Sequence, residues 1–507
     1  MTEKNRSWLT IACTWVLLLI LAYNRPLSLP DEGRYADIGR WMFTSGDWLV
    51  PRLNGIPFLH KPPLLYWLQA EVFGLVGVHV WAARWVTALH ALLLITCIHL
   101  GVRHVQGETA ARKATMVLGS SIGFLIGGQY INHDFMVATW ISVSIGLFAI
   151  ALQHEGRSRT LLARLGFMAC GLGVLSKGLI GLVLPGMVLT TWVILTGQWR
   201  QVIRLPWISG LALFCAIALP WMWQMQTKFS GFFDYFIVQQ HFSRFTGTNF
   251  NNPQPLWFYP AVIAILMFPW VLFVLADLVK SAVGFRKIRI APLDPWAALP
   301  WVWLLIILLF FSLPKSKLIG YILPVVPPVA LLAARSWDRL FGSKPSSERW
   351  FGLVFGLSLA LAIGANLLAR HNSLKDDSLD VAHQLSCASQ STDRIFVAGS
   401  YPFDLPFENK RSQALIVLQD WEQVSRSTSD GWRRIFYEGG EFDPQARQAL
   451  QNMDALQKTP ADGHSWLVAP AETAIAKTQD GWHIVFKGKA WWLWRKQEVS
   501  PSGPLCK

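Results

Sequence analysis

The residues of this sequence that are best suited to chemistry are ionisable groups that follow or separate long apolar runs. Asp31 and Glu32 come directly after the first run, in Leu29-Pro30-Asp31-Glu32-Gly33-Arg34-Tyr35. A proline followed by two acids predicts a helix start, since carboxylates there interact favourably with the free N–H groups and the helix dipole. A capped surface helix explains the same pattern. A position at the membrane surface, where a lipid-borne substrate arrives, favours a catalytic role.

A second segment, Phe58-Leu59-His60-Lys61-Pro62-Pro63, places a histidine and a lysine in a stretch stiffened by two prolines. A lysine held beside aromatic residues at a lipid interface can bind a phosphate as a compact point charge. The alternative is an interfacial anchor, in which the lysine reaches out of the bilayer and the aromatic rings form part of a belt. This segment alone favours neither interpretation.

Other polar residues lie at the ends of further apolar runs. Asp134 occupies a short turn between two uncharged runs. It either stabilises the turn as a solvated side chain or serves as a carboxylate of the site. Arg244, between two phenylalanines, can bind a phosphate through parallel N–H groups or flank the bilayer. The same class includes His241, Lys177, Lys317 and Tyr321. Several cations and several carboxylates on one membrane face suit a ligand that combines a phosphate with a sugar or an amine.

The elements that must position these residues are membrane-spanning helices. Of the 507 residues 52% are hydrophobic and 15% charged, where soluble domains have about 25% charged residues. Nearly uncharged stretches long enough to cross a ~30 Å hydrocarbon core recur before residue 370. They predict spans near 8–23, 82–102, 114–131, 135–152, 165–176, 179–196, 205–225, 257–279, 296–313, 318–334 and 350–369. We therefore expect a mainly α-helical polytopic membrane protein with about 11–13 transmembrane helices.

The distribution of basic residues predicts the orientation. Loops 103–113, 157–164, 280–289 and 335–349 are rich in Lys and Arg, which predicts that they face the cytoplasm. The intervening loops and everything after 370 then face outward. This alternation accounts for the formal charge of +14 without a nucleic-acid partner, which would require a basic soluble face with aromatic residues for stacking.

Two domains are expected: a membrane domain, 1–370, and a soluble α/β domain, 371–507. In the second domain the pattern predicts strands at 394–398 and 414–418 and helices at 378–388 and 443–453. A disulfide between Cys387 and Cys506 is possible in an oxidising compartment.

Five ordered segments within about residues 10–335 give the chain a family resemblance. Asp31-Glu32-Gly33-Arg34-Tyr35, Ser45-Gly46-Asp47-Trp48 and Lys61-Pro62-Pro63-Leu64 are followed by His241 with Arg244-Phe245 and by Ser316-Lys317-Leu318 with Gly320-Tyr321. Together they resemble the bacterial 4-amino-4-deoxy-L-arabinose transferases of lipid A, GT-C glycosyltransferases related to protein O-mannosyltransferases.

The resemblance implies an enzyme of the bacterial inner membrane whose active site and C-terminal domain are periplasmic. It would move a sugar from an undecaprenyl phosphate carrier to lipid A phosphate. By analogy Asp31, Glu32 and Asp134 are the catalytic carboxylates, and Lys61 and Arg244 hold the carrier phosphate. The predicted substrate site also includes Tyr321, His60, His241, Arg34 and Lys317.

Two departures from the family pattern affect these expectations. His60 and Gln240 stand where the family usually has glutamates. Some relatives use the first glutamate as a metal ligand, so its replacement predicts that no cofactor is required here. Zinc held by His60 and His241 is the alternative, for which the sequence offers only two ligands. Fewer carboxylates also suit a neutral or N-acylated sugar.

Two other functions fit the sequence less well. A related transferase could act on protein or on another envelope glycan. A multi-span transporter would show charged or unwound helix centres and often paired repeats, and the sequence shows neither.

Overall fold

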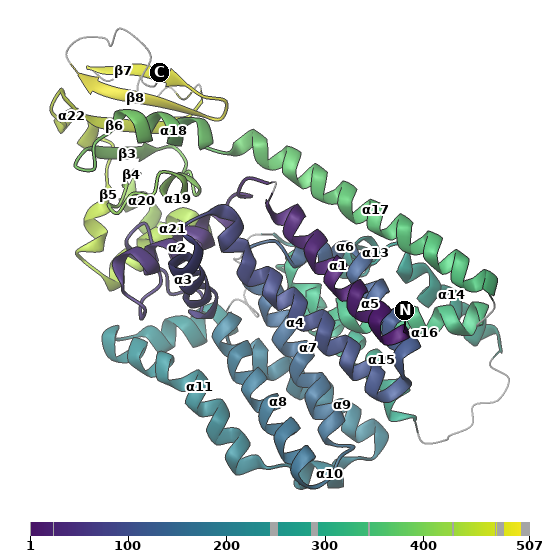
Figure 1. Ribbon diagram of the computed structural model, residues 1–507. Helices are drawn as coiled ribbons and strands as arrows, with labels where there is room; N and C mark the ends of the chain where they lie inside the picture. The colour runs from purple at the N-terminus through teal and green to yellow at the C-terminus, as the bar shows by residue number, and fades with distance from the viewer. Residues whose placement is uncertain are drawn as a thin grey trace.

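Long apolar helices form the part of the chain that the sequence predicts to lie in the membrane. The computed structural model describes residues 2–23, 25–243, 252–284, 293–342, 345–427, 430–471, 473 and 481–497 (Figure 1). Among these residues, eight helices are long and apolar enough to cross a membrane, or nine spans if one bent helix pair is counted. The eight are α1 (Glu3–Tyr23), α4 (Val80–Gln106), α7 (His133–Ala151), α8 (Gly156–Lys177), α11 (Trp207–Lys228), α15 (Pro295–Ser312), η2 with α16 (Ile319–Val325 and Val326–Phe341) and α17 (Pro345–Asp376).

The polytopic helical fold is thus confirmed, but the number of uninterrupted spans is lower than predicted. The run 114–131 is split at Ser121 into α5 (Glu108–Ser120) and α6 (Ile122–Gly127), because extended Ser121 caps the second helix through Phe124 N. The run 179–196 is the shorter helix α9 (Ile180–Thr196), and a five-residue helix, α10 (Trp199–Ile203), follows it.

The predicted span 257–279 is also broken. It consists of α13 (Phe258–Leu266) and α14 (Trp270–Gly284), whose axes differ by 116°. Pro269 lies at the break and has no N–H to continue the helical hydrogen bonds. The chain therefore turns sharply where hydrophobicity alone predicts a straight helix.

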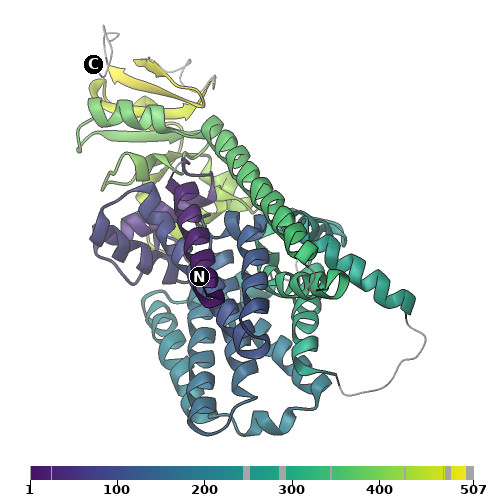
Figure 2. The ribbon, with the colours of Figure 1, turned by 45° about the vertical axis from the view of Figure 1, so that its right-hand side comes forward.

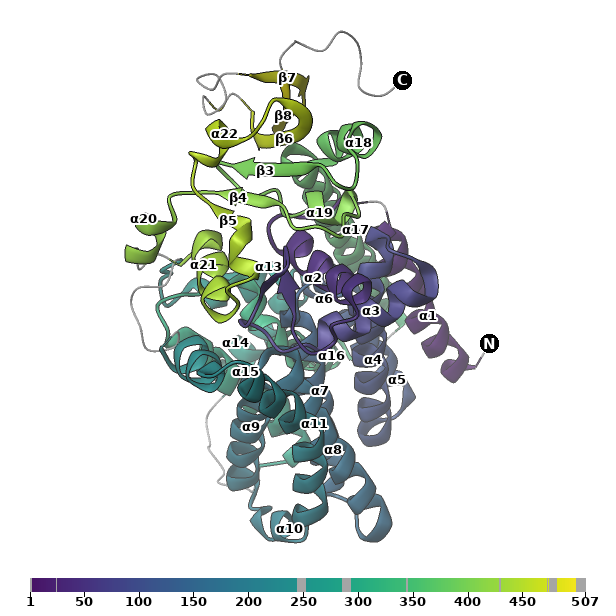
Figure 3. The same ribbon diagram turned by 90° about the vertical axis from the view of Figure 1, so that its left-hand side faces the viewer.

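A small layer of elements lies between the helical bundle and the C-terminal domain (Figure 3). It contains α2 (Asp31–Ser45), the hairpin β1 (Arg52–Leu53) and β2 (Ile56–Pro57), and α3 (Leu64–Val76). The hairpin turn Asn54-Gly55 has positive φ angles of 54° and 79°, which asparagine and glycine tolerate best. A further segment, the π-helix η1 (Asp234–Ser243), follows α11.

The C-terminal domain is built on one mixed sheet with the strand order β5-β4-β3-β6-β8-β7. The first four strands are parallel, and β8 is antiparallel to both its neighbours. The strands are β3 (Arg394–Ala398), β4 (Ile416–Leu418), β5 (Leu450–Gln451), β6 (Asp462–Pro470), β7 (Trp482–Lys487) and β8 (Trp491–Gln497). Its helices are α18 (Leu379–Ala388), α19 (Leu405–Glu408), α20 (Trp421–Arg426), α21 (Trp432–Phe442), η3 (Ala446–Ala449) and α22 (Ala455–Lys458).

The predicted strands and the helix at 378–388 are confirmed, whereas the helix predicted at 443–453 is wrong. That stretch holds η3 and the edge strand β5, in which Leu450 pairs with Val417 of β4. The helix lies one element earlier, as α21. Pairing with a distant strand therefore overrides the local helical pattern.

The two predicted domains are joined by α17 and by the layer that contains α2. Helix α17 runs from the bundle to the sheet and ends at Asp376, beyond the predicted boundary at 370 (Figures 1 and 2). A Cβ added to Gly33 of α2 would lie 2.8 Å from the backbone of Phe403, so the two domains meet at backbone distance here. Cys387 in α18 is disulfide-bonded; its predicted partner, Cys506, lies outside the described residues.

Candidate functional site

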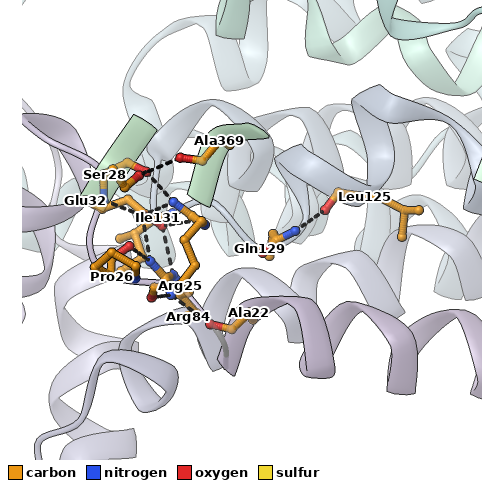
Figure 4. A network of polar contacts seen from close by, with 11 residues as sticks. Ala22, Arg25, Pro26, Ser28, Glu32, Arg84, Leu125, Gln129, Ile131 and Ala369 are labelled. Carbon is orange, nitrogen blue, oxygen red and sulfur yellow. Dashed lines mark hydrogen bonds and ion pairs between the residues drawn. The ribbon is translucent and has the colours of Figure 1, made fainter. Parts of the chain in front are cut away.

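Polar side chains gather where the layer that contains α2 meets the ends of α7 and α8. One cluster surrounds the Glu32 carboxylate, which is fully buried. Figure 4 shows the polar contacts of this residue. Arg25 Nη1 lies 2.6 Å and Arg84 Nη2 2.8 Å from Glu32 Oε2, and the backbone N–H of Ile131 donates to Oε1 at 3.0 Å. Burial alone would raise the pKa of Glu32, but the two arginines outweigh it and lower the pKa to about 2.

This network fixes the start of α2 against three other segments. Arg84 of α4 also donates to the carbonyls of Ala22 and Pro26, at 2.7 and 2.8 Å. Every oxygen of Glu32 is engaged, so none is open to a substrate. The sequence-based assignment of Glu32 as a catalytic acid does not fit this environment, and we assign it a positioning role.

Asp31, the neighbouring acid, has the opposite environment. Its side chain is 35% exposed, and the Arg34 guanidinium lies 4.0 Å away. Arg34 also stacks over the ring of Phe403 in the C-terminal domain, at 4.9 Å from the centroid. The Asp31 charge also acts electrostatically on the hydroxyls of Tyr66 and Tyr130. The structure therefore leaves a carboxylate and a guanidinium partly accessible, whereas the phenol of Tyr66 is buried.

His133, which the sequence did not single out as a site residue, contacts Tyr66 and is influenced by Lys61 and Lys177. Its Nε2 lies 3.0 Å from Tyr66 Oη and its Nδ1 2.6 Å from the Ser176 carbonyl oxygen. The ring also packs edge-on against Tyr35, with centroids 4.8 Å apart. Both Lys61 and Lys177 act on it electrostatically. The only signal in the sequence was its place beside Asp134 in a turn between spans.

Asp134 and Tyr321, both predicted site residues, meet at Lys177. The Lys177 ammonium forms an ion pair with Asp134, and its Nζ lies 4.1 Å from the centre of the Tyr321 ring. Gly320 packs directly against the Asp134 carboxylate, where a Cβ would overlap it. Asp134, Lys177 and Tyr321 thus form one unit, which hydropathy alone places on three separate helix ends.

His60 lies on the side that faces the C-terminal domain. Its Nε2 is 2.8 Å from Tyr235 Oη of η1, and Tyr235 donates to Glu438 Oε2 of α21 at 2.7 Å. Arg434 completes the chain by donating to the other Glu438 oxygen at 2.7 Å. His60 therefore connects the Lys61 segment, η1 and the C-terminal domain.

Of three further predicted substrate-binding residues, Lys317 contacts a backbone carbonyl, and the side chains of His241 and Arg244 are outside the described residues. Lys317 is 3% exposed, and its Nζ donates to the Gln254 carbonyl at 2.9 Å, so it holds the loop before α13. His241 belongs to η1, but its side chain is outside the described residues, as is all of Arg244. Within the described part of the chain, no group of three or more His, Cys, Asp or Glu residues is suited to hold a metal ion.

A pair of buried carboxyl groups lies where α2 contacts the C-terminal domain. Glu408 and Asp404 lie at the two ends of α19, which packs against α2. Burial, together with the nearby Asp404, raises the pKa of Glu408 to about 7, and burial raises that of Asp404 to about 6. Both acids are thus held in an environment that disfavours their charged forms.

We expect the stability of this contact to fall as pH rises. The pKa values in the folded protein lie above the ordinary 4.5 and 3.8, so the folded protein binds these protons more tightly and loses stability as pH rises from about 4 to about 7, above which the loss is complete. The melting temperature in detergent should drop from pH 5 to pH 8. Glu408→Gln should flatten the drop and stabilise the protein at pH 8 by about 3 kcal/mol.

The matched control is Glu422→Gln, whose carboxylate is 76% exposed on α20. It should retain the slope of the parent protein. A Glu408→Gln variant with an unchanged slope would show that this carboxyl does not titrate in the range.

Comparison with known proteins points to one group of enzymes. Residues 28–236 match the family described as dolichyl-phosphate-mannose-protein mannosyltransferase. The chain is 31% identical over 384 residues to an undecaprenyl phosphate-alpha-4-amino-4-deoxy-L-arabinose arabinosyl transferase from Pseudomonas paraeruginosa, covering 73% of this chain and 68% of the relative. A transferase of the same name from Pectobacterium carotovorum is 33% identical over 374 residues, covering 70% and 64%.

Solved structures share the fold. The crystal structure of ArnT from Cupriavidus metallidurans bound to undecaprenyl phosphate superimposes with a TM-score of 0.82 and 23% identity, over 99% of this chain and 100% of that one. The arabinofuranosyltransferase AftD from Mycobacteria is more distant, with a TM-score of 0.55 and 14% identity over 98% of this chain and 40% of that one. The chain is therefore a multi-pass membrane protein with the architecture of membrane glycosyltransferases.

Proposed function

This chain belongs to the undecaprenyl phosphate-α-4-amino-4-deoxy-L-arabinose arabinosyl transferases, and from that membership we propose that it moves this aminosugar from undecaprenyl phosphate to lipid A phosphate. We further propose that it works in the bacterial inner membrane with its site facing the periplasm. The excess of Lys and Arg in the opposite loops supports this orientation.

The observation that carries the proposal is the arrangement of charges around His133. The cations of Lys61 and Lys177 both act on it electrostatically, and the partly exposed Asp31 carboxylate acts in the same way on its partner Tyr66. A glycosyl phosphate has the same division: a phosphate that leaves with negative charge and an anomeric carbon that becomes positive. The cluster is therefore complementary to the separated charges of the transition state.

In this mechanism an acceptor phosphate oxygen attacks the anomeric carbon as the bond from that carbon to the carrier phosphate breaks. Undecaprenyl phosphate leaves with the bonding electrons, and Lys61 stabilises its charge. The acceptor is already anionic and needs no strong base, so Asp31 stabilises the positive charge that develops on the sugar. Lys177 balances the Asp134 charge and holds that carboxylate against Tyr321.

Mass spectrometry of lipid A and of total envelope glycans, from cells with and without the gene, tests the proposal. Loss of an aminopentose from lipid A phosphate in the deleted strain is the expected result. Unchanged lipid A with a sugar missing from another glycan would retain the transferase class and refute the acceptor.

One observation favours a second candidate, transfer of a lipid-linked sugar to protein. The match to the protein mannosyltransferase family covers residues 28–236, which include Asp31, Lys61, Asp134 and Lys177. With a protein hydroxyl as acceptor, Asp31 would have to act as a general base. A sugar missing from envelope proteins in the deleted strain would identify this reaction.

Gly320→Ala provides a test of the Asp134 unit. The added methyl group would overlap the Asp134 carboxylate and move it away from Lys177 and Tyr321. Because small displacements of a positioned group are costly in catalysis, we expect a loss of transfer rate of about tenfold to hundredfold. The rate is measured with purified enzyme and lipid-linked donor.

Gly364→Ala in α17, where an added Cβ meets nothing within 4 Å, is the matched control and should retain full activity. Equal activity of the two variants would contradict the assigned role of Asp134.

A further inference from the structure

A groove of about 380 Å³ lies between α4, α7, α15 and α16, away from the polar cluster. This volume falls within the ~300–1,000 Å³ typical of ligand cavities. Most of its wall is apolar and includes Leu94, Ile98, Leu299 and Trp303. The groove is therefore suited to a hydrocarbon chain.

Polar side chains lie at one end of the groove, near the C-terminal ends of α4, α7 and α16. They are His104 and Gln106 of α4, His154 after α7, and Arg335 of α16. The two histidine rings are 5.0 Å apart. The cavity thus combines an apolar trough with a basic, hydrogen-bonding end.

Two polar groups of this groove have few or no partners among the described residues. Arg335 makes one hydrogen bond, from Nε to Gln106 Oε1 at 3.5 Å, and no described carboxylate lies within 4.0 Å of it. Trp303 is 2% exposed, and its indole N–H has no acceptor in the described part of the chain. A buried N–H without an acceptor is costly unless a ligand supplies one, and Arg335, on which Asp294 acts only from beyond 4.0 Å, is free of a direct ion pair with a described carboxylate.

We infer that the groove binds one phospholipid with an anionic headgroup, drawn from the leaflet at this end of the bundle. Its phosphate would pair with Arg335, its ester carbonyl would accept from Trp303, and an acyl chain would fill the apolar wall. Basic pockets between transmembrane helices are suited to such headgroups.

The carrier phosphate of the proposed reaction is not the occupant. Lys61 precedes α3, and α4 then runs 27 residues from Val80 to Gln106. At 1.5 Å per residue the basic end of the groove is about 40 Å along α4 from the polar cluster, close to the thickness of a bilayer. The two phosphates therefore belong to opposite membrane faces.

Native mass spectrometry of the purified full chain tests the inference, with phosphatidylglycerol and phosphatidylcholine of identical acyl chains as probes. The parent protein should retain one phosphatidylglycerol more strongly than phosphatidylcholine. Arg335→Gln should lower phosphatidylglycerol retention about fivefold, since a basic residue near an anionic headgroup contributes about 1 kcal/mol. Retention of phosphatidylcholine should fall less, because its choline cation offsets the charge of the same phosphate.

Two further variants separate the headgroup from the chain. Gly146 lines the groove, and an added Cβ there meets nothing within 4 Å, so Gly146→Leu should fill it and lower retention of both lipids. Arg157→Gln, an exposed arginine that does not line the groove, should behave like the parent.

Equal retention of the two lipids by the parent, or equal effects of Arg335→Gln and Arg157→Gln, would overturn the inference. If Gly146→Leu does not fold, the arginine pair still decides. Because the readout is lipid retention, failure here is distinguishable from failure of the proposed transfer reaction.

Discussion

Replacing Asp31 by asparagine is expected to lower the rate of sugar transfer by about 10²–10³-fold while leaving the protein folded. The variant keeps the shape of the side chain and removes only its charge. Asp31 is 35% exposed, and its one ion pair, to Arg34, is long at 4.0 Å. Little stability therefore depends on it, because partly exposed pairs of this kind contribute about 0–1 kcal/mol.

The measurement is transfer from a lipid-linked donor by purified enzyme, with the melting temperature recorded in parallel. Glu71→Gln is the matched control, since Glu71 is an exposed acid on α3 in the same layer. It should retain both activity and stability. Full activity of Asp31→Asn would refute the role assigned to this carboxylate.

Replacing Glu32 by glutamine is expected to have the opposite effect: loss of folded protein. The substitution leaves Arg25 and Arg84 buried without their shared counter-charge. Removing one partner from a buried ion pair costs about 3–5 kcal/mol, because the remaining charge keeps its desolvation penalty. We expect a large drop in melting temperature and in the yield of monodisperse protein in detergent.

The comparison of these two variants is itself informative, because the residues are adjacent in sequence and chemically alike. Loss of activity at normal stability for Asp31→Asn, with loss of stability for Glu32→Gln, is the expected pair of results. A Glu32→Gln protein with normal melting but no activity would restore Glu32 as a catalytic acid.

The connection between His60 and Glu438 bears on how the two domains cooperate. Tyr235 bridges the two side chains, so the segment that carries Lys61 is tied to α21 of the C-terminal domain. Together with the close contact at Gly33, this ties the C-terminal domain to both sides of the layer that contains α2. Separate expression of the two domains would break these buried polar contacts.

Sequence by itself determined the membrane class, the apolar runs that become helices and the helix that begins at Asp31. These features depend on local properties: hydrophobicity over a span length, and the preference of proline and acids for a helix start. The segment before α3 and the turn that carries Asp134 were also found as candidates, because charge is rare in such surroundings.

Only the tertiary structure decided which of these residues face a substrate. Consecutive helical residues point about 100° apart. Asp31 is therefore turned outward, whereas Glu32 points toward Arg25, which follows α1, and Arg84 of α4. The pairing of Asp134 with Lys177, the central place of His133 and the strand pairing of Leu450 each join segments distant in sequence. Local patterns carry no information about such partners, which is why a single sequence predicts the polar residues but not their roles.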